Sequence, residues 1–289
     1  MKIGLLGFGE VGETLAADLL AIPDVELAAY DTQFFDTRSA PAVAIKRYEA
    51  VTAATTATAL AKDAELIISA VTAAQDVAAA RSITPGLMHG AFVLDLNSVS
   101  PVTKRECATI IGDAGGRYVE AAVMSPIAPK RIASPMLLGG PHAEDFLPVA
   151  AALGFSGARV VSEEVGQASA TKMCRSVIIK GLEALLAESL LTARHYRVED
   201  DVLASLGDLL KSPDWAVLAQ YMIGRSIEHG ARRAEEMREV AATVRSAGLD
   251  PWMSDACAKH QDRNARFRDA LHSRELSGML DIMRRDIPC

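Results

Sequence analysis

Long apolar runs, paired cysteines and an excess of basic residues are all missing from this sequence of 289 residues. No uninterrupted apolar stretch approaches the roughly 18 residues that a membrane-spanning helix needs. Thirty Lys and Arg stand against 37 Asp and Glu, giving a net charge of −7, so the basic face that nucleic acids require is not expected. We therefore expect no membrane and no nucleic acid among the partners of this protein.

Cysteine is scarce, and its placement excludes common metal and disulfide motifs. Four cysteines lie far apart, and none has a second cysteine at metal-ligand spacing: Cys107, Cys174, Cys257 and Cys289. We expect reduced thiols and no metal site. The first apolar run begins at Lys2, with no charged leader before a cleavable segment, so the expected location is the cytoplasm.

Half of the residues are hydrophobic, which excludes a disordered chain. Residues 1–160 follow a repeating pattern. Short apolar runs predict buried strands at residues 2–7, 25–31, 64–71, 91–97, 117–123 and 135–140. Segments of helical length separate them, for example residues 57–64 and 101–114. Strands alternating with helices predict a doubly wound parallel sheet of the Rossmann type, covered on both faces.

The strand pattern stops near residue 164, and the rest of the chain is predicted to be helical. Residues 166–198 contain no proline and form one long expected helix. Its apolar residues cover more than one stripe, which predicts burial on several sides: Val177, Ile178, Ile179, Leu182, Leu185, Leu186 and Leu190. Helix breaks are expected at residues 212–214 and 248–251. The predicted fold is α/β, with a Rossmann domain at 1–163 and an all-α domain at 164–289.

The most informative motif is Gly7-Phe8-Gly9-Glu10-Val11-Gly12. On its own a Gly-x-Gly-x-x-Gly string is weak evidence, but here a strand precedes it and a helix follows it. The first glycine allows a tight turn, the second lets the backbone approach a pyrophosphate, and the third lets helix and strand pack closely. The alternative is a structural turn that binds nothing; the full context favours a dinucleotide-binding turn.

Asp31 ends the next predicted strand, about 20 residues after the glycines. A carboxylate there accepts a hydrogen bond from the ribose 2′-hydroxyl and repels a 2′-phosphate, so NAD is favoured over NADP. Arg38 lies near enough in sequence to leave NADP possible, and Asp31 has the alternative of an ordinary strand-ending residue.

Lys172 is the leading candidate for proton transfer. It lies early in the long helix, with Ser169 and Ser176 at helical spacing. Desolvation would lower the pKa of a lysine there and allow proton exchange near neutral pH, whereas most lysines are simply exposed.

Two further segments have both a functional and a structural interpretation. Residues 95–101, with the sequence DLNSVSP, suit a loop at the functional edge of the sheet, and Ser100 with Pro101 also suits a helix start. His229, Arg232 and Arg233 suit either an acidic substrate or a solvated face shared with neighbouring glutamates.

Three motifs in this order resemble the β-hydroxyacid dehydrogenase superfamily over nearly the whole chain. They are GLLGFGEVG at the start, DLNSVSP in place of the family's Asp-x-Asn/Ser-Ser-x-x-Pro, and GQASATKMCRS in place of its Gly-x-x-x-x-x-Lys-x-x-x-Asn. The superfamily includes 6-phosphogluconate dehydrogenase, 3-hydroxyisobutyrate dehydrogenase and the imine reductases. The C-terminal half resembles a less characterised, phosphogluconate-dehydrogenase-like subgroup.

The resemblance implies roles for particular residues. Lys172 matches the catalytic lysine, which exchanges a proton with the substrate hydroxyl while hydride passes to or from the nicotinamide. The implied cofactor-binding residues are Gly7, Phe8, Gly9, Glu10, Val11, Gly12, Asp31, Val71, Thr72 and Asn97. The implied substrate-binding residues are Ser98, Val99, Ser125, Ser176 and Arg232.

The departures from the family lie where a substrate would bind. Glu120-Ala121-Ala122-Val123-Met124-Ser125-Pro126 replaces the family's Asp-Ala-Pro-Val-Ser-Gly-Gly, and Ser176 replaces its asparagine. The retained Lys172 favours a small, anionic hydroxyacid or its oxo form, because imine reductases usually replace this lysine. An imine or ketimine reductase and a non-catalytic NAD-binding protein are the alternatives. We also expect a homodimer formed through the helical domain.

Overall fold

A computed structural model describes residues 1–209 and 214–285, apart from the side chains of residues 188, 189, 192, 195 and 207–209. The chain divides into two compact units, Met1–Met173 and Cys174–Cys289. The sequence pattern placed the boundary after residue 163, where the strands end. The first turns of the long helix, from Gln167, group with the sheet instead. No described helix has both the length and the hydropathy needed to cross a bilayer.

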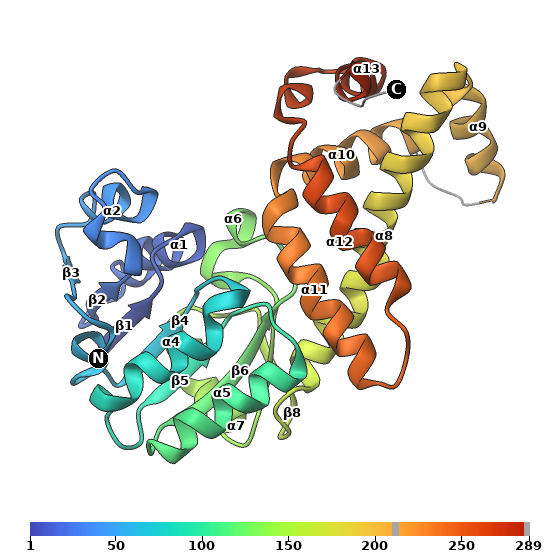
Figure 1. The fold of residues 1–289 in the computed structure, drawn as a ribbon. Coiled ribbons are helices and arrows are strands. Elements are labelled where there is room, and N and C mark those ends of the chain that lie inside the picture. The colour runs from blue at the N-terminus through green and yellow to red at the C-terminus, as the bar shows by residue number, and fades with distance from the viewer. Residues whose placement is uncertain (210–213, 286–289) are drawn as a thin grey trace. The chain divides into compact units, whose positions relative to one another are not determined.

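The first unit is an eight-stranded sheet in the order β3-β2-β1-β4-β5-β6-β7-β8 (Figure 1). The strands are β1 (Lys2–Leu6), β2 (Glu26–Tyr30), β3 (Val51–Ala53), β4 (Leu66–Ser69), β5 (Phe92–Asp95), β6 (Arg117–Val123), β7 (Met136–Gly139) and β8 (Ala158–Ser162). All six strands predicted from the sequence are present. The sequence missed β3, which has three residues, and β8, whose side chains alternate between half-buried and exposed.

The prediction of a parallel sheet is right except at one pair, since β6 and β7 are antiparallel. A parallel pairing needs a crossover, usually through a full helix. The connection from β6 to β7 carries only the four-residue α6 (Ile127–Lys130) and a 3-10 turn, Arg131–Ala133. The chain therefore folds back and β7 runs the other way.

Both faces of the central strands are buried, which explains their unbroken apolar runs. In β4, Leu66 and Ile68 belong to one apolar cluster and Ile67 to another. Besides α6 and the first turns of the long helix, the helices of this unit are α1 (Glu10–Leu19), α2 (Ala40–Ile45), α3 (Ala57–Ala61), α4 (Asp76–Ile83), α5 (Pro101–Asp113) and α7 (Ala143–Ala152). The expected helices at 57–64 and 101–114 correspond to α3 and α5.

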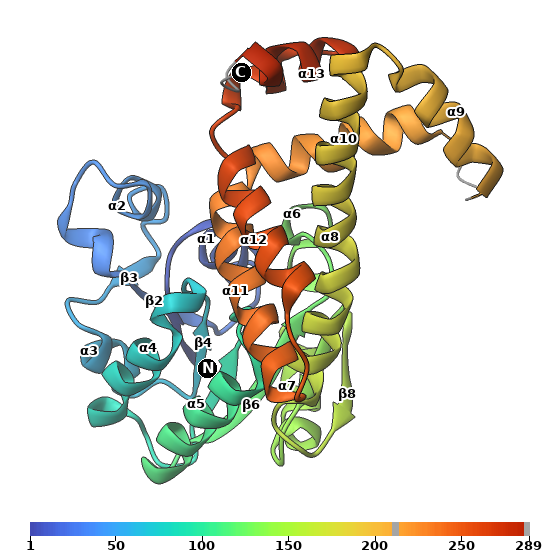
Figure 2. The same ribbon diagram turned by 45° about the vertical axis from the view of Figure 1, so that its right-hand side comes forward.

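The second unit is all helical, as predicted. Its helices are the main part of α8 (Gln167–Tyr196), then α9 (Glu199–Leu209), α10 (Trp215–Glu228), α11 (Gly230–Ser246), α12 (Trp252–Asn264) and α13 (Leu276–Arg285). Figure 2 shows α11 and α12 running side by side, joined at the expected break at 248–251. At the other expected break, Asp214 caps α10, whereas Ser212 and Pro213 lie outside the described residues. Cys289, one of the four cysteines, also lies outside them.

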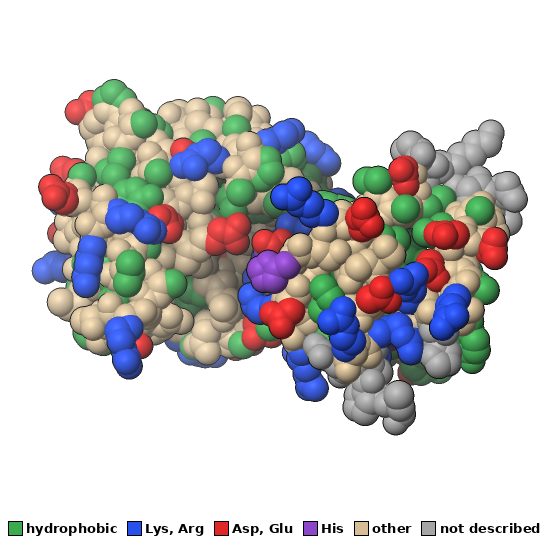
Figure 3. Space-filling model, turned by 90° about the horizontal axis from the view of Figure 1, so that it is seen from above, with side chains coloured by type: hydrophobic (Ala, Val, Ile, Leu, Met, Phe, Trp, Pro, Cys, Tyr) green, Lys and Arg blue, Asp and Glu red, His purple; other side chains and the backbone are tan. Residues whose placement is uncertain are grey.

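The expectation that α8 is buried on several sides is only partly correct. Leu186 and Leu190 pack with α10 and α13 in the core of the helical unit. Ile178 is 71% exposed and Leu185 is 54% exposed. Over the helical unit, on the right of Figure 3, acidic and basic side chains are interspersed and apolar ones lie among them. The apolar stripes of α8 thus exceed what this unit covers by itself.

Candidate active site

The three glycines of the turn after β1 have different surroundings. Gly7 has φ +98°, and a Cβ on it would lie 2.4 Å from the Ala70 carbonyl oxygen. A Cβ on Gly12 would lie 2.2 Å from the Gly7 carbonyl oxygen, because α1 packs closely against the turn. A Cβ on Gly9 would meet no described atom within 4 Å. The fold itself therefore requires Gly7 and Gly12, whereas Gly9 leaves open space beside the backbone.

The first turn of α1 supplies donors next to that space. Glu13 N–H donates to the Gly9 carbonyl at 2.9 Å, so the amides of Glu10, Val11 and Gly12 precede the first intrahelical bond. Such amides and the helix dipole favour an anion at this end. Phe8 differs, because its ring is buried and its N–H donates to Asp31 Oδ2 at 2.8 Å. Phe8 therefore supports the turn from inside.

Asp31 lies at the end of β2, directly beside the glycine turn. Its Oδ2 accepts the Phe8 N–H bond, and its Oδ1 accepts from Gln33 N–H at 2.9 Å. Both oxygens are thus oriented by the backbone, and the residue remains partly exposed. Arg38 is far more exposed, with its side chain 3.9 Å from Asp36. The structure places Asp31 where the dinucleotide-binding motif requires an acid.

The loops after β4 and β5 meet at the same edge of the sheet. Their strands pair in parallel with Ser69 beside Asp95, so both chains leave the sheet side by side. Asn97 joins the two loops, because its Oδ1 accepts from Val71 N–H at 2.7 Å and its Nδ2 donates to Ser69 Oγ at 2.9 Å. Asn97 is buried, whereas Thr72 is exposed. Asn97 holds the Val71–Thr72 loop in place.

Lys172 and Ser98 come together across 74 positions of sequence. Lys172 Nζ donates to Ser98 Oγ at 2.5 Å in a partly buried position. The next residue, Val99, is fully buried, so its side chain belongs to the core. Ser100 caps α5 and Pro101 follows at the first helical position, so the loop is a helix start as well as an edge of the site. The structure thus joins two of the predicted residues directly.

Glu120 is a supporting residue that the sequence did not reveal, beyond its departure from the family's aspartate. It lies on β6 and is fully buried. Its two carboxylate oxygens accept from Gly166 N–H and Ser169 N–H, each at 2.6 Å. A carboxylate at a helix N-terminus is favoured by the unpaired amides and the dipole. Glu120 therefore fixes the start of α8, the helix that carries Lys172.

The other three predicted substrate residues, Ser125, Ser176 and Arg232, are far apart in sequence, and each has different neighbours. Ser125 follows β6, is half-buried and donates to the Pro126 carbonyl at 3.1 Å. Ser176 and Arg232 belong to the helical unit. Ser176 is buried and accepts from Lys180 Nζ at 3.2 Å, while Arg232 lies 3.3 Å from Glu236. Arg232 thus takes part in the mixed-charge face that was the alternative interpretation of this helix.

Comparison with known proteins identifies the family of the N-terminal domain. Residues 2–166 match the family model described as the NAD binding domain of 6-phosphogluconate dehydrogenase, and residues 193–263 match a domain of unknown function. A conserved hypothetical protein from Sinorhizobium meliloti 1021 is 35% identical, with 99% of this chain and 97% of that one covered and a TM-score of 0.76.

Two further solved structures extend the comparison. A conserved protein of unknown function, reported as structurally similar to 3-hydroxyacid dehydrogenases, is 30% identical over 96% of this chain and 99% of its own, with a TM-score of 0.70. The 3-hydroxyisobutyrate dehydrogenase of Mycobacterium tuberculosis shares the fold at 16% identity over 98% and 99% of the chains, with a TM-score of 0.72. This chain therefore belongs to the β-hydroxyacid dehydrogenase superfamily, with an N-terminal domain of the 6-phosphogluconate dehydrogenase NAD-binding family.

Proposed function

We propose that this protein is an NAD(P)-dependent oxidoreductase that acts on a small anionic hydroxyacid or its oxo form, with Lys172 as general acid and base. The hydrogen bond from Lys172 Nζ to Ser98 Oγ carries the proposal. It brings an amine to the loop after β5, and β5 ends beside β4, which in turn pairs with β1 before the glycine turn. Ligands of such sheets bind at the carboxyl ends of the strands.

The residues present fit a dinucleotide. The space at Gly9 admits a phosphate, the amides of Glu10 and Val11 face it from the helix start, and Asp31 suits a ribose hydroxyl. The Asp31 carboxylate would repel a 2′-phosphate, so we propose NAD as the preferred cofactor and NADP as the alternative. Val71 and Thr72 are proposed to line the same cofactor.

The chemistry follows from what Lys172 and Ser98 can do. A bound nicotinamide supplies the hydride acceptor in oxidation and the hydride donor in reduction. Lys172 Nζ takes the proton of the substrate hydroxyl in oxidation and returns it in reduction. Ser98 Oγ accepts a hydrogen bond from Nζ, which leaves the Ser98 hydroxyl proton available for a substrate oxygen. Ser125, Ser176 and Arg232 remain predictions for substrate contacts.

The cofactor half of the proposal is tested at Gly9. Gly9→Ala places a methyl group where the phosphate is proposed to lie, so NADH affinity should fall by about tenfold or more. Gly112→Ala is the matched control, because a Cβ there also meets no described atom and Gly112 lies on α5, away from the turn. Affinities are measured by NADH fluorescence titration. Equal affinity in both variants would contradict a pyrophosphate at Gly9.

The catalytic half is tested at Lys172. Lys172→Met should abolish turnover across a hydroxyacid panel and spare NADH binding, whereas Lys62→Met removes an exposed lysine and should change neither. Near-normal turnover of Lys172→Met would remove this lysine from the mechanism. Activity on ketoacids only when an amine is added would favour an imine reductase. Cofactor binding without turnover on any substrate would favour a non-catalytic role.

We also propose that the chain forms a homodimer through its helical unit and works in the cytoplasm. Large apolar side chains are exposed on the helical unit, including Ile178, Leu185, Tyr221 and Trp252. We propose that a second copy covers these side chains in the dimer. Light scattering at micromolar concentration should give a mass of twice 30.7 kDa, and a monomer would contradict the dimer.

A further inference from the structure

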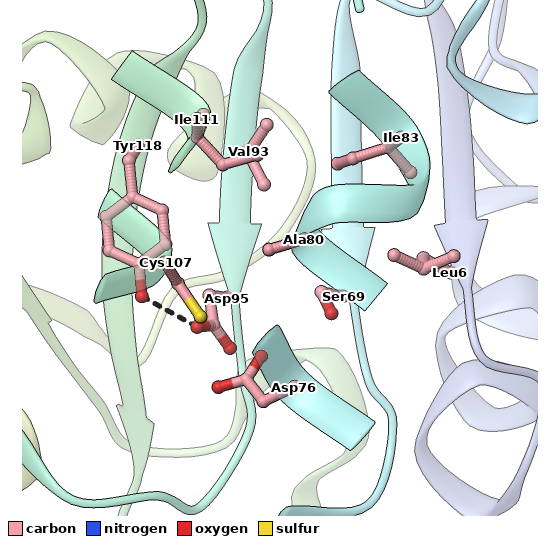
Figure 4. Close-up of a pocket in the computed structure, with 10 residues that line it drawn as sticks. All are labelled: Leu6, Ser69, Asp76, Ala80, Ile83, Val93, Asp95, Cys107, Ile111 and Tyr118. Atoms are coloured by element: carbon pink, nitrogen blue, oxygen red, sulfur yellow. Dashed lines mark hydrogen bonds between the residues drawn. The ribbon is translucent and has the colours of Figure 1, made fainter. Parts of the chain in front are cut away.

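A cluster of buried charges lies beneath the loops after β4 and β5, and the proposed reaction does not use it. Asp76 begins α4, Asp95 ends β5 and Lys104 lies on α5; their exposed fractions are 2%, 1% and 0%. Figure 4 shows the carboxyl groups of Asp76 and Asp95 near the Cys107 thiol, at one end of a cavity lined otherwise mostly by apolar side chains. These groups come from four different elements, since Tyr118 on β6 also faces them.

Asp95 is fully satisfied within this cluster. Its Oδ1 lies 2.8 Å from Lys104 Nζ and accepts from Asn97 N–H at 2.9 Å, while its Oδ2 accepts from the Tyr118 hydroxyl at 2.6 Å. Lys104 Nζ also donates to the Asp95 carbonyl at 3.0 Å. One ammonium group and one carboxylate therefore balance each other in the interior.

Asp76 is the third ionisable side chain of the cluster, and the Lys104–Asp95 pair provides no further positive charge to balance it. Its Oδ1 accepts from Asn97 Nδ2 at 2.7 Å, but its buried Oδ2 has no hydrogen-bond partner among the described residues. One carboxylate oxygen of Asp76, one of Asp95 and the Sγ of Cys107 lie within 4.8 Å of one another. A second carboxylate so close to Asp95 costs several kcal/mol in a medium of low polarity. A proton on Oδ2 removes that repulsion.

The electrostatics agree with a protonated Asp76. Burial, and then the Asp95 carboxylate, raise the pKa of Asp76 to about 7, although Lys104 and the Asn97 amide act in the other direction. The Cys107 thiol is neutral, because burial raises its pKa far above the ordinary value, and Tyr118 stays neutral for the same reason. Burial lowers the pKa of Lys104, but the carboxylates of Asp95 and Asp76, with a smaller effect of Glu120, outweigh burial and raise that pKa. Lys104 thus already supplies the positive charge that a metal ion would bring.

The cluster is tied to the proposed cofactor loop by a single amide. Asn97 binds Asp76 through Nδ2 and holds the Val71 N–H through Oδ1. We propose that Asp76 is a positioning residue that, in its protonated form, holds the Val71–Thr72 loop through Asn97 in the conformation that binds the dinucleotide. Loss of the proton places a second negative charge beside Asp95; this repulsion exceeds the gain from a stronger Asn97 hydrogen bond to the ionised carboxylate, so Asp76 moves away from Asp95. This inference rests on the proposed function of the loop in cofactor binding.

The test is the pH profile of NADH affinity. If only the protonated form binds well, a group with a pKa of about 7 leaves about 3% competent at pH 8.5, so Kd should rise up to about 30-fold between pH 6 and pH 8.5. Asp76→Asn, a neutral side chain of the same shape, should keep the pH 6 affinity and lose most of this rise. Asp113→Asn, at an exposed position on α5, is the matched control and should keep the wild-type profile.

A measurement on the unaltered protein removes any dependence on how well the variant folds. The protection of the Val71 amide against hydrogen exchange should fall above pH 7, beyond the ordinary base-catalysed increase in exchange. The proposal is overturned by constant protection of Val71, by an equal pH profile in Asp76→Asn, or by a stoichiometric metal ion in the purified protein. A wild-type protein that binds no dinucleotide at any pH would instead refute the proposed function.

Discussion

The buried carboxylate of Glu120 offers a direct test of how the chain positions Lys172. Glu120→Gln replaces one acceptor oxygen by an amide group that can only donate. That group would then face either Gly166 N–H or Ser169 N–H, each of which donates to the wild-type carboxylate at 2.6 Å. One backbone amide is left without an acceptor in a fully buried position, and the negative charge at the start of α8 is lost.

The expected cost follows from these contacts. A hydrogen bond to a charged group contributes about 1.5–3 kcal/mol, and the remaining bond is weakened to a neutral one. A loss of about 3 kcal/mol in the local stability of the α8 start is therefore expected. Because 1.4 kcal/mol corresponds to a factor of ten, the amides of Gly166 and Ser169 should exchange with solvent about 100-fold faster.

Amide hydrogen exchange followed by NMR gives the rates at Gly166 and Ser169 separately. Glu164→Gln is the matched control, since it removes the same charge at an exposed position two residues before Gly166. Glu120→Asp keeps the charge with a shorter side chain and should fall between the two. Rates in Glu120→Gln within about threefold of the control would refute a role for Glu120 in fixing this helix.

Three further outcomes are expected. Gly12→Ala should lower the free energy of unfolding by about 2 kcal/mol or more in urea titrations, because its Cβ would lie 2.2 Å from a backbone oxygen; an unchanged midpoint would refute the close packing of α1. The pKa of Asp76 rises from 3.8 in the unfolded chain to about 7 in the fold, so stability is lost as pH rises from about 4 to 7. Asp76→Asn should therefore gain stability relative to wild type across that range, by up to about 4 kcal/mol, and parallel unfolding curves would contradict this. Asp31→Ala removes the acceptor for Phe8 N–H and the proposed ribose contact, so NADH affinity should fall by about tenfold and the preference for NADH over NADPH should shrink, whereas exposed Asp36→Ala should leave both unchanged.

Much of the first unit could be predicted from local patterns. The six apolar runs became strands because most of them are buried on both faces, as with Leu66 and Ile67 of β4. The glycine spacing was informative because two of its requirements are local to one βα turn: Gly7 has a positive φ, and Gly12 packs against the Gly7 carbonyl. The contact of Gly7 with Ala70 is long-range. The direction of β7 was not predictable in this way, because it depends on the absence of a full crossover helix between β6 and β7.

The sequence by itself determined the class of fold, the position of the dinucleotide-binding turn and Lys172 as the candidate base, because each depends on residues close together in the chain. Only the tertiary structure decided which groups these side chains contact. Lys172 meets Ser98, Glu120 meets the start of α8, and Asp76 shares a buried cluster with Lys104. The physical reason is that these contacts join segments far apart in sequence, and local periodicity specifies which face of an element is buried but not which charges it meets there.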